Sequence, residues 1–212
     1  MNDLDLASLL VSRVCHDLVS PVGAVINGLE VIDDDDDPAM QAEALRLIRR
    51  SADQASAKLQ FARLAFGASG SRGDMMPIGD VREAAARLFE DGKAKLEWRA
   101  EEMELPKAQV RCLANLVALG GECLPRGGTV TVAVEFAPKS TQLVVRCQGQ
   151  GAKFSDDFQA ALAGETALDK VEGRMVLAVI LGRVARAHGG QTLVETRPDD
   201  VVLAAHFTGP VS

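Results

Sequence analysis

The chain has 212 residues, of which 47% are hydrophobic and only 4% aromatic, with no tyrosine. This length holds one large or two small domains, and the hydrophobic fraction is ample for a packed core. Asp and Glu outnumber Lys and Arg by 30 to 23, which gives a net charge of −7. Such an acidic balance argues against a protein that binds the phosphate backbone of nucleic acids.

The sequence also gives no signal of export or of a membrane segment. The strongest apolar run, Val176 to Leu181, is far too short to span a bilayer, and residues 1–5 are acidic where a secretory signal would be basic. The cysteines have no CxxC spacing, which favours reduced thiols over a zinc site; they are Cys15, Cys112, Cys123 and Cys147. We therefore expect a cytoplasmic protein with no membrane segment and no metal site of its own.

Residues 4–66 predict a long helical hairpin. Apolar residues recur at helical spacing from Leu10 to Ile32 and again from Met40 to Phe66, and Asp37-Pro38 is typical of a helix start. The acidic run 33–37 joins the two helices; we interpret it as a solvated turn, because the oxygen spacing of a metal loop is absent. A hairpin this apolar should pair with a copy of itself, which predicts a homodimer with a four-helix bundle.

One narrow strip of the first helix carries no large apolar side chain, and His16 lies within it. The strip consists of Ser12, Arg13, His16, Ser20, Gly23 and Asn27. Because these positions follow helical spacing, they share one face, and we expect the imidazole to face water. Cys15 lies on the apolar flank and is expected in the core.

Residues 69–77 are expected to link the hairpin, residues 1–68, to a second domain, residues 78–212, because small residues such as glycine and serine are frequent there. Helical patterns near 79–91, 107–124, 155–163 and 174–188 alternate with strand patterns at 95–98, 129–136, 142–147, 191–195 and 201–207. The second domain is therefore predicted to be α/β, with helices on one face of a mixed sheet.

Three segments resemble sensor histidine kinases. Residues 15–22, Cys-His-Asp-Leu-Val-Ser-Pro-Val, resemble the H-box; residues 115–130 are similar to the N-box and the strand after it; residues 183–190 resemble the helix that ends in His-Gly-Gly. The three segments occur in the same order as in the kinases, and the resemblance covers nearly the whole chain. The resemblance implies an α plus α/β fold: a dimerising hairpin, then a degenerate histidine-kinase-like, Bergerat-type α/β sandwich.

The departures from the kinase pattern concern nucleotide binding. Leu119 stands where the kinases hold Mg²⁺ with asparagine, and Cys147 stands where an aspartate recognises adenine. Met175 and Leu177 replace two glycines of the phosphate loop. We therefore expect a pseudokinase that binds no ATP and keeps only the phosphoacceptor helix.

This combination resembles the ChpT family of bacterial histidine phosphotransferases. The resemblance implies that His16 accepts a phosphoryl group from the receiver domain of a hybrid kinase and passes it to response-regulator receivers, in a CckA to CtrA or CpdR type of cell-cycle pathway. It implies no cofactor other than Mg²⁺ supplied by the partner receiver. The alternatives are a non-catalytic dimeric pseudokinase scaffold that binds response regulators, and an atypical autophosphorylating kinase.

The chemistry of the strip fits the same interpretation. A neutral imidazole is an adequate nucleophile toward an acyl phosphate, and catalysis then depends on positioning and on cations. Arg13 is a candidate to meet the phosphoryl charge, and Lys or Arg residues of the second helix are alternatives for that role. Asp17 is a candidate to accept a proton or to hold the imidazole tautomer. Ser12, Ser20, Gly23 and Asn27 are candidate partner contacts, and Pro21 should leave a carbonyl near Asp17 free.

Overall fold

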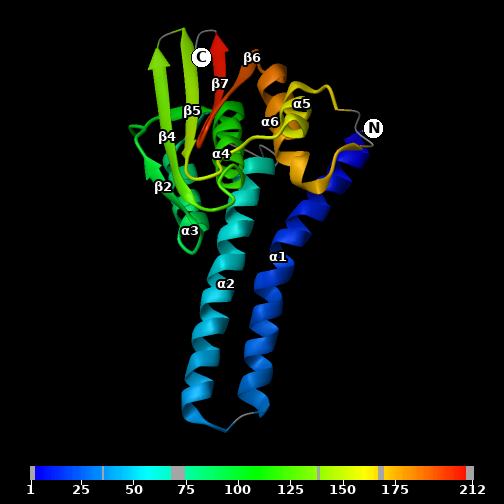
Figure 1. Ribbon diagram of the computed structural model, residues 1–212, viewed down its shortest axis with the longest axis vertical. Coiled ribbons are helices and arrows are strands. Elements are labelled where there is room, and N and C mark those ends of the chain that lie inside the picture. The colour runs from blue at the N-terminus through cyan, green and yellow to red at the C-terminus, as the bar shows by residue number, and fades with distance from the viewer. Residues whose placement is uncertain (1–2, 35, 68–74, 138, 167–169, 209–212) are drawn as a thin grey trace.

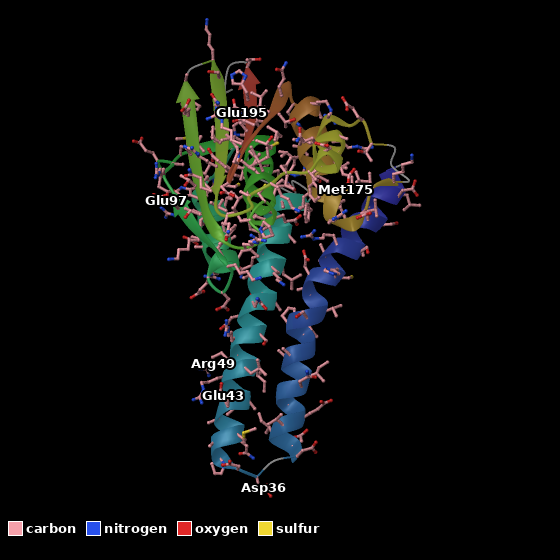
Figure 2. All side chains as sticks on the ribbon, viewed as in Figure 1. Asp36, Glu43, Arg49, Glu97, Met175 and Glu195 are labelled. Carbon is pink, nitrogen blue, oxygen red and sulfur yellow. The ribbon has the colours of Figure 1, made fainter. Side chains whose placement is uncertain are left out.

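The computed structural model describes residues 3–34, 36–67, 75–137, 139–166 and 170–208, and in it a long helical hairpin projects from an α/β domain (Figure 1). The hairpin consists of α1 (Asp3–Asp34) and α2 (Pro38–Phe66), as predicted. Asp37 caps α2, because its side chain accepts a hydrogen bond from the Ala39 N–H at 3.0 Å. Asp36 marks the tip of the hairpin, while Glu43 and Arg49 point away from α1 (Figure 2).

Close packing holds the two helices of the hairpin together, but it leaves much apolar surface uncovered. A Cβ added at Gly28 would lie 2.6 Å from Ile48 Cγ1, so α1 and α2 approach closely there. Large apolar side chains that are 43 to 72% exposed in the chain are Leu4, Val11, Val19, Val22, Ile26, Leu29, Met40, Leu45, Leu47 and Leu59. We call this set the exposed apolar stripe; a monomer in water would leave it unpaired.

The α/β domain contains β1 (Met75–Pro77), α3 (Gly79–Phe89), β2 (Ala94–Trp98), β3 (Glu104–Pro106), α4 (Lys107–Glu122), β4 (Gly128–Ala137), β5 (Ser140–Gln148), α5 (Asp156–Ala163), the short 3-10 helix η2 (Gly173–Met175), α6 (Val176–Ala187), β6 (Gly190–Arg197) and β7 (Asp200–Thr208). In the described part of the chain, five strands form a sheet of order β2-β4-β5-β7-β6, in which only the β2–β4 pair is parallel. The sheet is therefore mixed, as predicted.

The core of this domain lies between the sheet and α4 and α6. Strand β5 alternates, with Leu143, Val145 and Cys147 fully buried, so that one face of the sheet meets the helices. A Cβ at Gly120 would lie 2.8 Å from Val145 Cγ1, and the glycine therefore lets α4 press against the sheet. The pair Gly120-Gly121 thus includes a tight packing site.

Two expectations need correction. The last residues of the expected linker, 75–77, form β1, which pairs antiparallel with β3; the rest of it, up to residue 74, lies outside the described residues. The expectation that no segment could span a bilayer was also wrong by length and composition: Leu4–Asp34 of α1 is long enough, with a mean hydropathy of 1.5 in its best window. Its apolar residues are spread between polar ones, so a search for an unbroken run overlooks them.

Candidate functional site

His16 lies near the middle of α1, and its side chain is 85% exposed. Ser12, Ser20 and Asn27 are exposed as well, and Gly23 is half-buried. Apart from Arg13, the helix therefore presents the polar strip to solvent, as its periodicity predicted. A globular partner can approach the imidazole here without displacing any large side chain of the strip.

Asp17 connects His16 to the rest of the molecule. Its Oδ1 lies 3.4 Å from His16 Nδ1, at the outer limit of a hydrogen bond, while its Oδ2 accepts a hydrogen bond from Arg13 Nε at 2.9 Å. Arg13 Nη2 in turn donates to Glu122 Oε1 at 2.6 Å. Glu122 is the last residue of α4, so this series of contacts runs from the exposed histidine into the α/β domain.

The position of Arg13 differs from the expectation that it meets the phosphoryl charge. The Arg13 side chain is only 20% exposed, and both carboxylates it contacts neutralise its charge. Burial lowers the pKa of Arg13, but the carboxylates of Glu122 and Asp17 outweigh that effect and raise the pKa overall. Arg13 therefore ties α1 to α4, and it is not a free cation beside His16.

For Glu122, burial has a larger effect on the pKa than the charged partner has, which is the reverse of the situation at Arg13, where the two carboxylates together outweigh burial. Burial raises the pKa of Glu122, and the Arg13 guanidinium offsets only part of that increase. The carboxylate therefore takes up a proton at a higher pH than an exposed glutamate does. Acidification weakens the Arg13–Glu122 ion pair before it affects ordinary surface carboxylates.

Pro21 has the expected effect on the helix, and the structure adds its partner. A proline has no N–H, so the carbonyl of the residue four positions earlier, Asp17, receives no helical hydrogen bond from it. Lys58 Nζ of α2 donates to this Asp17 carbonyl at 2.8 Å. Lys58 is thus a site residue that the sequence analysis did not name; it satisfies the carbonyl next to His16 from the other helix of the hairpin.

A cavity of about 400 Å³ lies beside this cluster, between the hairpin and the α/β domain. Arg13, Asp17, Lys58 and Glu122 are among its polar lining residues, and its apolar lining includes Phe61 and Phe89. The polar groups of the cluster therefore lie against an apolar surface, where bulk water screens their interactions less than on the open strip.

The positions that correspond to nucleotide contacts in kinases belong to the hydrophobic core. Leu119 and Cys147 have no exposed surface, and Met175 and Leu177 are 4% exposed. Met175 lies where η2 approaches the first turns of α1 (Figure 2). A hydrogen bond to Cys147 and burial raise the pKa of the neighbouring Cys123 thiol well above its usual range, so the Cys123 thiol stays protonated.

Asn115, the asparagine that the N-box retains, contributes to packing between the domains. Its side chain is fully buried, and Nδ2 donates to Ala65 O at 3.1 Å and to Arg111 O at 2.8 Å. Ala65 belongs to the last turn of α2. The amide therefore ties α4 to the end of the hairpin.

Two remaining residues have simpler positions. Cys15 is exposed in the chain, contrary to its expected place in the core, because its side of α1 faces neither α2 nor the α/β domain. His188 is the C-terminal cap residue of α6, as the His-Gly-Gly pattern predicted. Among the residues that the structure describes, no three His, Cys, Asp or Glu side chains form a group that could hold a metal ion.

The fold is that of the dimerisation and catalytic regions of histidine kinases. Over 91% of the chain and 94% of the other, it is similar to the histidine kinase domain from the Erythrobacter litoralis EL346 blue-light activated histidine kinase, with a TM-score of 0.51 and 11% identity. At that identity the likeness concerns the fold alone.

Residues 78–200 match the family of histidine phosphotransferase C-terminal domains. The chain is 33% identical over 205 residues to the protein phosphotransferase ChpT of Brucella abortus (strain 2308), with 97% of each chain covered. It is also similar to a solved bacterial phosphotransferase, with a TM-score of 0.86, 32% identity and 97% of each chain covered. The chain belongs to the ChpT-type histidine phosphotransferase family and is a phosphotransferase of a phosphorelay.

Proposed function

We propose that His16 is the phosphoacceptor of this phosphotransferase. One observation carries the assignment: the imidazole is 85% exposed, and its Nδ1 side faces the Asp17 carboxylate at 3.4 Å. A proton on Nδ1 is the one that Asp17 can accept in a hydrogen bond, which leaves the Nε2 lone pair free as the nucleophile. Asp17 then acts as the residue that selects the tautomer.

The transfer balances without a nucleotide. Nε2 forms a bond to the phosphorus of a receiver phosphoaspartate, the bond between phosphorus and the acyl oxygen breaks, and the aspartate carboxylate leaves with the electron pair. The reverse sequence loads a second receiver. Negative charge on the transferred oxygens requires a cation, and we assign that role to Mg²⁺ of the receiver's own acidic pocket.

The receivers in this proposal belong to a hybrid kinase, as donor, and to response regulators, as acceptors. The similarity to a protein phosphotransferase ChpT supports a role in a phosphorelay, and we propose that this phosphorelay is of the CckA to CtrA or CpdR type in cell-cycle control. The exposed positions Ser12, Ser20, Gly23 and Asn27 would contact the receiver surface around its phosphorylated aspartate. The transfer would then take place in the cytoplasm.

A second copy of the chain is the proposed occupant of the exposed apolar stripe. The stripe runs along both helices of the hairpin, so two hairpins related by a twofold axis can bury it in a four-helix bundle. This arrangement also accounts for the apolar character of α1 without a membrane. Arg13 of α1 also makes charged contacts, with Asp17 in the same helix and with Glu122 of α4, and these contacts favour packing of α1 against protein.

We further propose that the α/β domain binds no ATP. Leu119 and Cys147 are buried among apolar neighbours, and neither offers an oxygen for Mg²⁺ or for the adenine amine. The side chains of Met175 and Leu177 occupy positions where backbone amides would need to approach phosphate. Calorimetric titration with ATP and Mg²⁺ should show no binding at micromolar concentrations; saturable heat in that range would contradict the proposal.

The main experiment supplies a receiver phosphorylated with labelled phosphate and follows the label onto this chain and then onto a second receiver. We expect an acid-labile, base-stable label that disappears in His16→Ala. His188→Ala is the matched control, because His188 is also exposed but lies in the α/β domain, and it should take up label like the wild type.

Other outcomes select the alternatives. Receiver binding without transfer would indicate the scaffold and would contradict the phosphoacceptor role of His16. Label acquired from ATP and Mg²⁺ alone, without any receiver, would indicate an autophosphorylating kinase. Sedimentation analysis of the same samples tests the dimer separately.

A further inference from the structure

We propose that Glu122, the last residue of α4, is a positioning residue for His16 that acts through Arg13 and Asp17. The proposal rests on the phosphoacceptor role of His16. It gives the α/β domain a part in the transfer reaction, although that domain supplies no reacting atom.

The contacts form an unbroken series. Glu122 Oε1 accepts a hydrogen bond from Arg13 Nη2 at 2.6 Å, Arg13 Nε donates to Asp17 Oδ2 at 2.9 Å, and Asp17 Oδ1 lies 3.4 Å from His16 Nδ1. Each oxygen of Asp17 therefore has a different neighbour. Because Oδ2 is held by Arg13, Oδ1 is the oxygen that faces the imidazole.

The guanidinium explains why Glu122 can affect Asp17 at a distance. It is planar, so fixing one nitrogen on Glu122 also fixes the direction of the Nε–H that points at Asp17. Without Glu122, only a contact between residues four apart on one helix would hold the flexible Arg13 side chain, and such contacts are weak. Glu122 thus fixes the orientation of the Asp17 carboxylate from a second helix.

The exposure of the side chains changes along the series. Glu122 is 28% exposed, Arg13 20% and Asp17 35%, whereas His16 is 85% exposed. The anchoring end lies against the cavity between the domains, and the reactive end lies in the open strip. A receiver docked on the strip would therefore meet His16 and not Glu122, so loss of Glu122 should change the reaction step and leave docking intact.

A second ion pair between the hairpin and the α/β domain provides the control. Arg50 of α2 donates to Asp91 through Nε at 3.0 Å and through Nη2 at 2.8 Å. Asp91 follows α3, and its ion pair with Arg50 does not involve the His16 cluster. Asp91→Asn thus also removes an ion pair between the hairpin and the α/β domain, although a more exposed one, and it leaves the series from Glu122 to His16 intact.

The first test measures the tautomer of His16 by long-range ¹H–¹⁵N NMR on the full chain, without any receiver. The chain has three histidines, so the His16 signals are assigned by their loss in His16→Ala. We expect the proton on Nδ1 in the wild type and in Asp91→Asn, and a mixture of tautomers in Glu122→Gln. Unchanged His16 signals in Glu122→Gln would overturn the proposal.

The second test measures transfer from a phosphorylated receiver over a range of receiver concentrations. We expect Glu122→Gln to lower the rate constant at saturation about tenfold. This loss is smaller than the rate factor that a group acting directly in proton transfer contributes, because Glu122 acts only through Arg13 and Asp17. The half-saturating receiver concentration should stay within about twofold of the wild type, since phosphate positioning and docking are separate. Asp91→Asn should leave both values unchanged.

A double substitution tests whether Glu122 acts through Arg13. Lysine keeps the charge of Arg13 but cannot reach both carboxylates at once, so Arg13→Lys should reproduce the slow transfer, and Arg13→Lys with Glu122→Gln should be no slower than Arg13→Lys alone. Additive losses, or equal losses in Glu122→Gln and Asp91→Asn, would overturn the proposal. If the wild type accepts no label from any receiver, the phosphoacceptor role fails, while the NMR result still decides whether Glu122 orients His16.

Discussion

Helices α1 and α6 are both rich in apolar residues, but only α6 buries them within the chain. Eight of its residues are buried: Val176, Leu177, Ala178, Val179, Ile180, Leu181, Gly182 and Ala185. In the described part of α1, only Pro21 and Gly28 are buried, although α1 is far longer. Apolar composition therefore shows that a helix needs a partner, and the structure shows whether that partner lies in the same chain.

The difference separates two kinds of stability. The α/β domain has a core within one chain, to which Phe61 and Ala65 of α2 contribute, and it should unfold with a midpoint that is independent of protein concentration. The hairpin has an uncovered apolar face, so under the dimer proposal its stability depends on the concentration of the second copy. The four predictions below test this division, from the largest expected effect to the smallest.

Leu119→Ala should destabilise the α/β domain by about 2 to 5 kcal/mol, because it leaves a cavity in a closely packed core. Leu119 is fully buried, and the only tryptophan, Trp98 in β2, reports the unfolding of this domain by fluorescence. The loss should be the same at every protein concentration. Leu193→Ala is the control, since Leu193 is 57% exposed on β6 and should cost less than about 0.5 kcal/mol. Equal losses would contradict the burial described here.

Ile26→Glu should weaken the dimer at least about 100-fold, because burial of an isoleucine is worth about 1.5 to 3 kcal/mol and the twofold axis applies the change twice. Ile26 is 52% exposed in the chain and belongs to the exposed apolar stripe. Sedimentation equilibrium measures the dissociation constant. Asn27→Glu adds the same charge at the next residue, which belongs to the polar strip and not to the exposed apolar stripe, so it should leave the dimer intact. A dimer that tolerates Ile26→Glu would place the interface elsewhere.

Lys58→Met should destabilise the hairpin by about 1 to 3 kcal/mol, because the Asp17 carbonyl loses its donor. In a Pro21→Ala background the N–H of residue 21 can reach this carbonyl, and the same substitution should then cost about 1 kcal/mol less. Thermal unfolding followed by circular dichroism gives the four values of the cycle.

Arg49→Met is the control for that cycle, since Arg49 lies on α2 and points away from α1 (Figure 2). Its cost should not depend on residue 21. If Lys58→Met costs the same in both backgrounds, the hydrogen bond to Asp17 does not contribute to the stability of the hairpin.

The smallest effect concerns acid stability and Asp200. A hydrogen bond from Arg146 lowers the pKa of Asp200 in the folded state, below the usual value of about 3.9 in the unfolded chain. The folded state then binds fewer protons, so the stabilisation is present above pH 4 and is lost as the pH falls through the folded-state pKa. Asp200→Asn should therefore lose less stability than the wild type between pH 5 and pH 3, by roughly 2 °C in Tm at most. Identical pH profiles would contradict the lowered pKa.

Much of the fold could be predicted from the sequence because its patterns are local. The helical spacing that ends near Ile32 and begins again near Met40 gives the hairpin, and the alternation of apolar and polar residues along β4 gives a central strand of the sheet. Strands β1 and β3 were missed because three residues are too few to display a period of two. Their pairing depends on tertiary structure that brings residues 75–77 and 104–106 together.

The exposure of His16 was predictable for the same reason, since it depends on its own helix. Lys58 and Glu122 were missed because they are 41 and 109 residues from their partners, Asp17 and Arg13. For Lys58 a signal was present: an antiparallel hairpin that turns near residue 36 places residue 17 opposite residues 55 to 58, where α2 has its only lysine. No comparable local signal indicates that Glu122 contacts Arg13, and the distinction between a free and a paired Arg13 depends on that contact.

The length of the hairpin determines what can dock beside His16. From His16 to the end of α1 at Asp34, the helix extends about 27 Å beyond the imidazole, close to the diameter of a small domain. The α/β domain lies at the opposite end (Figure 1). Under the proposed function, a receiver docked with its active site at the imidazole would lie along the part of the hairpin between His16 and the turn. Shortening both helices by two turns should therefore weaken receiver docking, while His16 and its contact with Asp17 stay in place.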